Sequence, residues 1–231
     1  MPANLNDQGL SRLVAARFVT IGILSAALLF FTAGSIRYWQ GWVLLAIQWG
    51  GMTWIIRYFL RHDPALLARR LQHRIAGEKT ALQKALQISG QLCFLGTLLV
   101  ACLDHRFGWS HLPVPLVVAG ELLVACCLGG MFLVFRENTY ASVLIEVAPR
   151  QTVVSTGPYR IVRHPVYAVG LLFIGGMPLA LGSAWALLFL LPVAAVLLVR
   201  LTDEEKFLVE HLPGYAEYRT HTRFRLIPGI F

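Results

Sequence analysis

Charged residues are scarce in this chain. Only 14% of its 231 residues are Asp, Glu, Lys or Arg, whereas 57% are hydrophobic. Soluble domains carry about 25% charged residues, so the deficit indicates an integral membrane protein with no room for a separate soluble domain. The net charge of +8 does not indicate a nucleic-acid partner, because the basic residues lie between apolar runs rather than on one continuous face.

Other common signatures are also missing. The four cysteines, at positions 93, 102, 126 and 127, lie in apolar runs and lack the spacing of metal ligands. Because the histidines are scattered as well, we expect no metal site. No Gly-x-Gly-x-x-Gly loop points to a dinucleotide cofactor. We also expect no cleavable secretory signal, since the N-terminus lacks a short apolar core followed by a small-residue cleavage site.

What the chain does have is a series of apolar runs, at about residues 17–34, 41–59, 88–103, 115–135, 167–181 and 184–199. The runs 17–34 and 41–59 approach the ~20 residues that cross a hydrocarbon core. The last two are shorter and hinge at Gly182-Ser183, so we expect a tight helical hairpin that need not reach the far surface. A helix lying on the membrane surface is expected within the polar connection 60–87. The predicted fold class is an all-α integral membrane protein with about six transmembrane helices.

The basic residues are distributed very unevenly between the two predicted sides of the membrane. All of the 20 Lys and Arg residues except Arg37 and Arg106 fall in the N-terminus, the two long polar connections and the C-terminal tail. Because positive loops stay in the cytoplasm, we predict a multi-pass protein with both termini cytoplasmic. We divide it into N-terminal transmembrane helices (1–135) and a C-terminal region (136–231) that includes the hairpin and a cytoplasmic cofactor-binding part.

Two polar segments flank the predicted hairpin, which would return them to the same membrane surface. The first contains Gly157-Pro158-Tyr159 and Arg163-His164-Pro165-Val166-Tyr167. Pro165 suits the first turn of a helix, and a helix N-terminus favours a carboxylate or phosphate. With Arg163 and His164 as donors and two tyrosines as flat surfaces, this set suits an anionic small molecule with an aromatic part. The alternative is that Arg163 and His164 are ordinary interfacial anchors.

The second segment contains Arg200 and the pair Glu204-Glu205. In one interpretation, Arg200 and Glu204, which are four residues apart on a helix, form an ordinary surface ion pair worth about 0.3–0.5 kcal/mol. Alternatively, Arg200 receives an anionic group at membrane depth, where an arginine is costly unless it is used. Glu121 lies inside the fourth run and also has two interpretations. Its carboxyl could face a cavity, or it could reach the membrane interface.

The order of these motifs resembles the isoprenylcysteine carboxyl methyltransferase family, which is related to the phospholipid N-methyltransferases. The shared pattern covers about residues 135–231 and consists of Gly-Pro-Tyr (157–159), Arg-His-Pro-x-Tyr (163–167), an apolar hairpin, Arg-x-x-x-Glu-Glu (200–205), Pro-Gly-Tyr-x-x-Tyr (213–218) and Leu-Ile-Pro (226–228). The resemblance implies an S-adenosylmethionine-dependent methyltransferase. Its substrate would be a lipophilic or isoprenylcysteine-like carboxylate that enters from the bilayer among membrane lipids.

The resemblance also implies roles for individual residues. The cofactor pocket would be lined by Gln151, Thr152, Val153, Val154 (a strand-like segment), Tyr159, His164, Pro165, Val166, Tyr167 and Glu204. Arg200 would hold the substrate carboxylate near the methyl group, with Arg163 as a second substrate-binding residue. An amine substrate would need a proton acceptor, for which Glu205 or Glu121 are candidates. The chain departs from many relatives at Gln151, where a histidine is frequent, and at His221-Thr222, where an Arg-Val pair is frequent.

Three alternatives remain open on the sequence alone. The same pocket would serve N-methylation of phospholipid head groups. A membrane reductase of the sterol type, which shares the C-terminal architecture but uses a nicotinamide cofactor, is disfavoured by the Glu-Glu pair. A transporter is disfavoured because no apolar run carries a chain of polar groups.

Overall fold

The computed structural model describes residues 7–72, 80–141, 144–149 and 151–231, and all regular structure within these ranges is helical. The helices are α1 (Asp7–Ala33), α2 (Trp39–His62), α3 (Pro64–Gln72), α4 (Ala81–Phe107), α5 (Val114–Glu137), α6 (Pro165–Ala180), α7 (Leu190–His211) and α8 (Tyr215–His221), with 3₁₀ turns η2 (Gly157–Arg160) and η3 (Trp185–Phe189). The predicted all-α class is therefore confirmed for the described residues. The strand-like segment 151–154 forms no strand, so that part of the prediction was wrong.

Five of the described helical segments are long and apolar enough to cross a membrane: Gly9–Ala33, Trp39–His62, Ala81–Phe107, Val114–Glu137 and Trp185–His211. The fifth predicted run became α6, which has only 16 residues. At 1.5 Å per residue such a helix is about 24 Å long, shorter than a hydrocarbon core of about 30 Å. The first arm of the predicted hairpin is therefore short, as predicted, whereas the second belongs to the segment Trp185–His211, which is long enough to cross a membrane.

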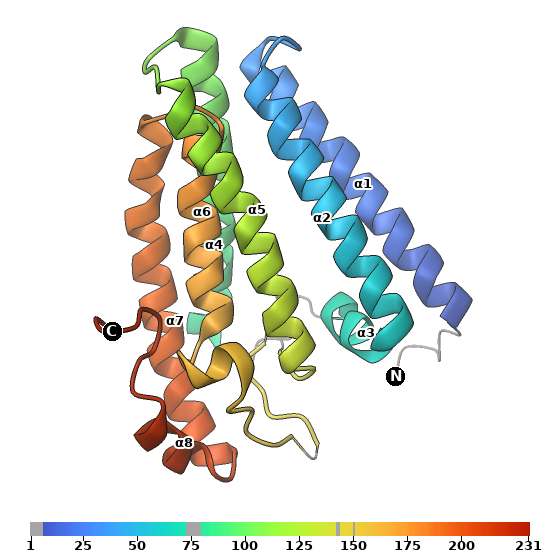
Figure 1. Ribbon diagram of the computed structural model, residues 1–231, viewed down its shortest axis with the longest axis vertical. Coiled ribbons are helices and arrows are strands. Elements are labelled where there is room, and N and C mark those ends of the chain that lie inside the picture. The colour runs from blue at the N-terminus through green and yellow to red at the C-terminus, as the bar shows by residue number, and fades with distance from the viewer. Residues whose placement is uncertain (1–6, 73–79, 142–143, 150) are drawn as a thin grey trace.

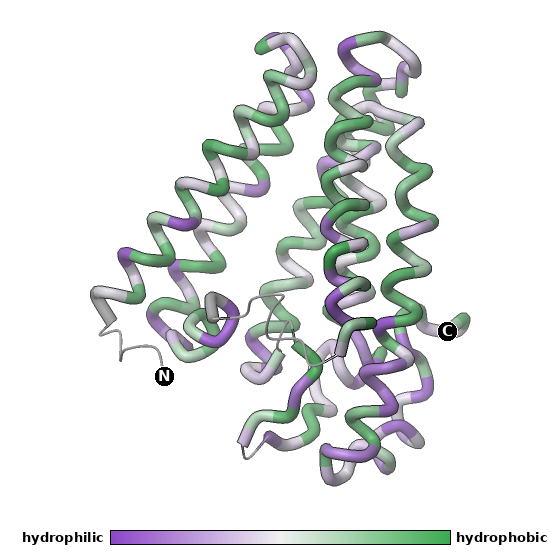
Figure 2. The backbone as a smooth tube through the Cα atoms, turned by 180° about the vertical axis from the view of Figure 1, so that it is seen from behind, coloured by the Kyte–Doolittle hydropathy of each residue, from purple (hydrophilic) through white to green (hydrophobic). Residues whose placement is uncertain are grey.

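The long helices run roughly alongside one another, so their connections collect at two ends (Figure 1). The start of α1, the helix α3, the end of α5, the start of α6 and the helix α8 all lie at one end, which we call the polar end. Hydrophilic segments are concentrated there, while the helices above it are mostly hydrophobic (Figure 2). The predicted grouping of polar connections is therefore present in the fold.

The closest helix packing involves α5 and α6. A Cβ added to Gly120 of α5 would lie 2.3 Å from the backbone nitrogen of Ala180 in α6, and one added to Gly176 would lie 3.3 Å from Leu123 and Val124. The helix α6 packs more extensively against α5 than against α7. The predicted hairpin partners, α6 and α7, are consecutive in the chain, but glycine-mediated contact joins α6 mainly to the preceding helix instead.

The end opposite the polar end is fixed by buried hydrogen bonds. The Tyr38 hydroxyl donates to the Leu181 carbonyl at 2.5 Å. Asp104 accepts from the Ser110 backbone at 2.6 Å and from the Ser183 hydroxyl at 2.5 Å. These bonds tie the turn between α6 and η3 to the start of α2 and the end of α4.

The helix α7 is continuous from Leu190 to His211. It extends well beyond the predicted sixth apolar run, which ends at about residue 199. Since no break occurs, Arg200, Glu204 and Glu205 are held on one rigid helix. A helix is present within the predicted polar connection as α3, and its N-terminus is capped by Asp63, which accepts from the Leu66 amide at 3.0 Å. The remaining residues 73–79 of that predicted segment lie outside the described ranges.

Candidate functional site

A cavity of about 320 Å³ lies where the segment 138–167 meets α4, α7 and α8. One part of its wall is apolar and comes from α4 and α7, including Leu86, Gly90, Val196 and Leu197. The rest is polar and aromatic. The lining contains every residue predicted for the cofactor and both predicted substrate-binding arginines: Gln151, Thr152, Val153, Val154, Tyr159, Arg163, His164, Pro165, Val166, Tyr167, Arg200 and Glu204.

The loop that carries most of these residues is shaped by a turn and by the C-terminal tail. Gly157 has φ +55, a left-handed conformation that glycine adopts without penalty, and it is the first residue of the 3₁₀ turn η2. The Arg163 and His164 amides donate to the carbonyls of Phe224 and Arg225 at 2.9 and 3.0 Å. Pro165 then begins α6, whose first-turn amides have no partner within the helix. The tail therefore holds this helix N-terminus in place against the cavity.

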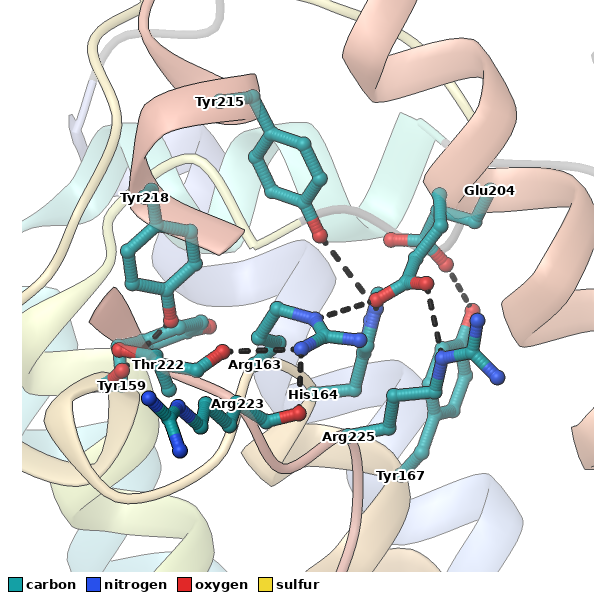
Figure 3. Close-up of polar contacts among 11 residues, drawn as sticks. Tyr159, Arg163, His164, Tyr167, Glu204, Tyr215, Tyr218, Thr222, Arg223 and Arg225 are labelled. Atoms are coloured by element: carbon teal, nitrogen blue, oxygen red, sulfur yellow. Dashed lines mark hydrogen bonds and ion pairs between the residues drawn. The ribbon is translucent and has the colours of Figure 1, made fainter. Parts of the chain in front are cut away.

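One carboxylate joins the loop, α7 and the tail. Glu205 is 3% exposed, and its Oε1 accepts from Arg163 Nε at 2.5 Å and lies 3.3 Å from His164 Nε2. Its Oε2 pairs with Arg225 Nε at 2.9 Å. Arg163 also donates to the carbonyls of Thr222 and Arg223, at 2.9 and 2.7 Å. Figure 3 shows these groups converging from the loop and the tail.

Glu205 does not line the cavity. Each of its oxygens faces an arginine or a histidine. This arrangement suits a charged carboxylate that holds the loop and the tail in place. The motif predicts Glu205 as a proton acceptor, but its position outside the cavity gives that role less support. Glu121, the other candidate, is buried on α5 and does not line the cavity either.

A second polar chain does reach the cavity. The Tyr167 hydroxyl donates to Glu204 Oε2 and accepts from Arg200 Nε at 3.2 Å. Arg200 NH1 donates to Gln83 Oε1 at 3.0 Å, and Gln83 Nε2 donates to Asp203. Arg200 is 7% exposed, so its charge is held in a largely dehydrated setting beside the cavity.

Three tyrosines complete the wall. Tyr218 donates to the Tyr159 carbonyl at 2.5 Å, and the Tyr215 hydroxyl lies 3.5 Å from His164 Nε2. Burial raises the pKa of Tyr218 to about 12, and it also raises the pKa of Tyr159 and Tyr215. All three phenols are therefore neutral near pH 7 and can donate hydrogen bonds.

Several residues of the site were missed at the sequence level. Arg70 of α3 lines the cavity, donates to the Ala141 carbonyl at 2.9 Å and lies 4.2 Å from the Phe135 ring centroid. Burial lowers the pKa of Arg70. Asn138 also lines the cavity, and Gln83 accepts a hydrogen bond from Arg200. Their positions carry no local signal, because all three lie near helix ends and are brought to the cavity only by folding.

The fold and the site together describe a helical membrane protein with a mixed cationic, aromatic and apolar cavity at its polar end. Residues 116–213, from α5 through α7, match the model of the phospholipid methyltransferase family. That family is related to the isoprenylcysteine carboxyl methyltransferases, so the resemblance drawn from the motifs is confirmed. The match includes Arg163, His164, Arg200 and Glu204.

A named relative is the cobalt-zinc-cadmium resistance protein CzcN of Cupriavidus metallidurans. It is 32% identical to this chain over 137 residues, which cover 51% of this chain and 62% of that protein. The chain thus spans somewhat less than two thirds of the relative's length. Among the residues that the structure describes, no group of three or more His, Cys, Asp or Glu side chains is placed to hold a metal ion.

Proposed function

We propose that this protein is an S-adenosylmethionine-dependent methyltransferase of the membrane, which O-methylates the carboxylate of a lipophilic or isoprenylcysteine-like substrate. The observation that carries the proposal is the lining of the 320 Å³ cavity. Eight residues from the two polar motifs meet there with the four residues 151–154, together with an apolar wall from α4 and α7. The match of residues 116–213 to the phospholipid methyltransferase family supports the same reaction class.

The residues present fit this cofactor. The volume lies at the lower end of the range of about 300–1,000 Å³ for small-molecule sites. The start of α6 and the His164 ring offer donors to a carboxylate, while Glu204 offers an acceptor to an ammonium or to ribose hydroxyls. Val153, Val154 and Tyr159 supply flat or apolar surface for an adenine ring. When bound, the cofactor supplies a methyl group that is already activated as a sulfonium.

The protein then has two tasks, to align the acceptor and to exclude water. Arg200 would hold the substrate carboxylate by charge-assisted hydrogen bonds, and Arg163 would add positive potential from the loop. A carboxylate needs no base, because it attacks in its charged form. The apolar wall formed by Leu86, Val196 and Leu197 would accommodate the lipophilic part of the substrate.

The second candidate is N-methylation of a phospholipid head group, which the family match itself favours. An amine arrives protonated and needs a proton acceptor. Glu204 lines the cavity and is better placed for this role than Glu205, which is committed to two arginines. The two candidates thus assign the central role to different residues, Arg200 for a carboxylate and Glu204 for an amine.

The same proposal includes the placement of the protein. Both termini and the cavity would face the cytoplasm, where the cofactor is dissolved, because the polar end holds most of the basic residues. The acceptor would come from the bilayer, and the surrounding partners would be membrane lipids. We propose neither a nucleic-acid partner nor a resident metal.

Calorimetric binding of S-adenosylmethionine to the detergent-purified protein tests the cofactor. We expect micromolar affinity that Glu204→Gln and His164→Ala weaken at least several-fold. The matched control is Glu210→Ala, which removes an exposed carboxylate farther along α7 and should leave affinity unchanged. Absence of binding to a folded protein would refute the methyltransferase assignment.

Assays with two acceptors separate the substrate classes. Transfer of a labelled methyl group to a farnesylcysteine carboxylate, lost in Arg200→Ala with cofactor affinity retained, would support O-methylation. Transfer to phosphatidylethanolamine, lost in Glu204→Gln but not in Arg200→Ala, would support N-methylation instead.

A further inference from the structure

The residue that fixes Arg200 comes from outside both sequence motifs and outside the region matched by the family. Gln83 lies in the first turn of α4 and is 3% exposed. Its Oε1 accepts from Arg200 NH1 at 3.0 Å, and its Nε2 donates to Asp203, three residues beyond Arg200 on α7. One buried amide therefore bridges α4 to two positions on α7.

The orientation of this amide is determined by its partners. A guanidinium only donates hydrogen bonds and a carboxylate only accepts them. The Gln83 oxygen must therefore face Arg200 and its nitrogen must face Asp203. Thr80-x-x-Gln83 is also a capping-box pattern, in which the glutamine side chain would reach back to the N-cap amide. Here the Thr80 hydroxyl does cap the Gln83 amide, at 3.2 Å, but the Gln83 side chain turns to α7 instead.

The neutrality of the amide matters for the chemistry. A glutamate at position 83 could still accept from Arg200, but its charge would neutralise the guanidinium that a substrate carboxylate has to meet. A leucine would leave Arg200 NH1 without this acceptor in a buried setting, where an unmade hydrogen bond is costly. Glutamine accepts a hydrogen bond from Arg200 without adding a negative charge beside it.

We infer that Gln83 is a positioning residue for the acceptor carboxylate, because its buried amide holds Arg200 at the cavity wall and adds no negative charge there. This inference rests on the proposed function, in which Arg200 holds the carboxylate. The Tyr167 hydroxyl, 3.2 Å from Arg200 Nε, contacts a second guanidinium nitrogen. Together, Gln83 and Tyr167 hold the guanidinium group between α4 and α6.

The kinetic test uses N-acetyl-S-farnesylcysteine as the acceptor, with the purified full chain in detergent. We expect Gln83→Leu and Gln83→Glu each to raise the KM for this acceptor about tenfold, the size expected from losing one hydrogen bond to a charged group. The KM for S-adenosylmethionine should stay within about twofold. The control Ala85→Glu adds the same charge at an exposed position of α4 and should change neither KM.

Gln83→Glu distinguishes positioning from simple helix bridging. The glutamate can still accept from Arg200, but it loses the bond to Asp203 and places a second carboxylate beside it, so a purely structural role predicts a lower melting temperature with parallel changes in both KM values. Our inference predicts a raised acceptor KM even where the melting temperature is unchanged. An unchanged acceptor KM in Gln83→Glu would overturn it, as would parallel changes in both KM values and in melting temperature in both variants.

A second measurement does not depend on activity. Modification of Arg200 by phenylglyoxal, followed by mass spectrometry of the folded protein, reports how firmly the guanidinium is held. We expect slow modification in the wild type and at least several-fold faster modification in Gln83→Leu. If the wild type methylates no carboxylate probe, the proposed substrate class fails. The positioning of Arg200 is then decided by this measurement, and equal rates in both proteins would overturn it.

Discussion

Glu205 should matter more to the stability of the folded protein than to the cavity. Its carboxylate is 3% exposed and is paired with Arg163 at 2.5 Å and Arg225 at 2.9 Å. Removing one partner of a buried ion pair costs about 3–5 kcal/mol, because the remaining charge is buried without compensation. Arg163 keeps two backbone carbonyl partners, and the Arg225 side chain is 30% exposed and can be hydrated. We therefore expect the lower end, about 3 kcal/mol, for Glu205→Ala.

Thermal unfolding in detergent, followed by tryptophan fluorescence, measures this loss. For a chain of this size each kcal/mol shifts the melting temperature by about 2–4 °C, so Glu205→Ala should melt about 6–12 °C below the wild type. Glu205→Gln keeps the shape and one acceptor, and should lose less. Glu204→Gln is the matched control, since its neighbouring carboxylate lines the cavity. That variant should weaken cofactor binding while leaving the melting temperature nearly unchanged.

A small drop in the melting temperature of Glu205→Ala would contradict this prediction. A drop below about 3 °C, equivalent to about 1 kcal/mol, in Glu205→Ala would mean that the cluster around Glu205 does not hold the loop and tail together. A second contrary result would be a Glu205→Gln variant that melts like the wild type but transfers no methyl group to an amine. That outcome would restore the proton-acceptor role predicted from the motif.

Two further predictions concern the packing around the site. Tyr218→Phe removes the 2.5 Å bond to the Tyr159 carbonyl and should lower the free energy of unfolding by about 1 kcal/mol. Because burial raises the pKa of Tyr218 to about 12, from about 10 when unfolded, this contribution is fully present below pH ~10 and is lost as the pH rises toward 12. The difference from wild type should therefore be constant between about pH 6 and 9, and a difference that varies there would contradict the assignment. Gly120→Ala should cost about 1–3 kcal/mol, because the new Cβ would lie 2.3 Å from the Ala180 nitrogen. The control Gly129→Ala meets nothing within 4 Å, and equal melting temperatures for the two alanine variants would show that α5 and α6 can separate freely.

The helical membrane class followed directly from the sequence, because long apolar runs with few charges have few other stable forms. The short length of α6 followed as well, since its 16 residues lie between Pro165 and the turn at Gly182-Ser183. The length of the last apolar helix did not follow. The run 184–199 predicts a short arm, yet the segment Trp185–His211 is long and apolar enough to cross a membrane. The helix continues through Arg200 and Glu205, whose charges are matched by Gln83, 117 positions away, and by Arg163, 42 positions away. Those partners cannot be seen in the local pattern.

The distinction between Glu204 and Glu205 shows how far a motif can go. Successive residues on a helix are rotated by about 100°, so adjacent glutamates cannot face the same way. Glu204 shares a face with Arg200, and both line the cavity. Glu205 shares a face with Leu201, which is fully buried. The helical spacing therefore predicts that Glu204 and Glu205 lie on different faces of the helix. Which of the two faces lines the cavity depends on how the tail packs.

The sequence by itself determined the helical membrane class and the two motifs, and the resemblance it carried picked out twelve residues that line one cavity. It could do so because short-range spacing and turn residues such as Gly157 and Pro165 control local structure. The tertiary structure decided what each of those residues can do. It committed Glu205 to Arg163 and Arg225, placed α6 against α5, and brought Gln83 from 117 residues away to Arg200. The physical reason is that a buried charge has to be matched by partners from other elements, and those partners are chosen by packing rather than by nearness in the chain.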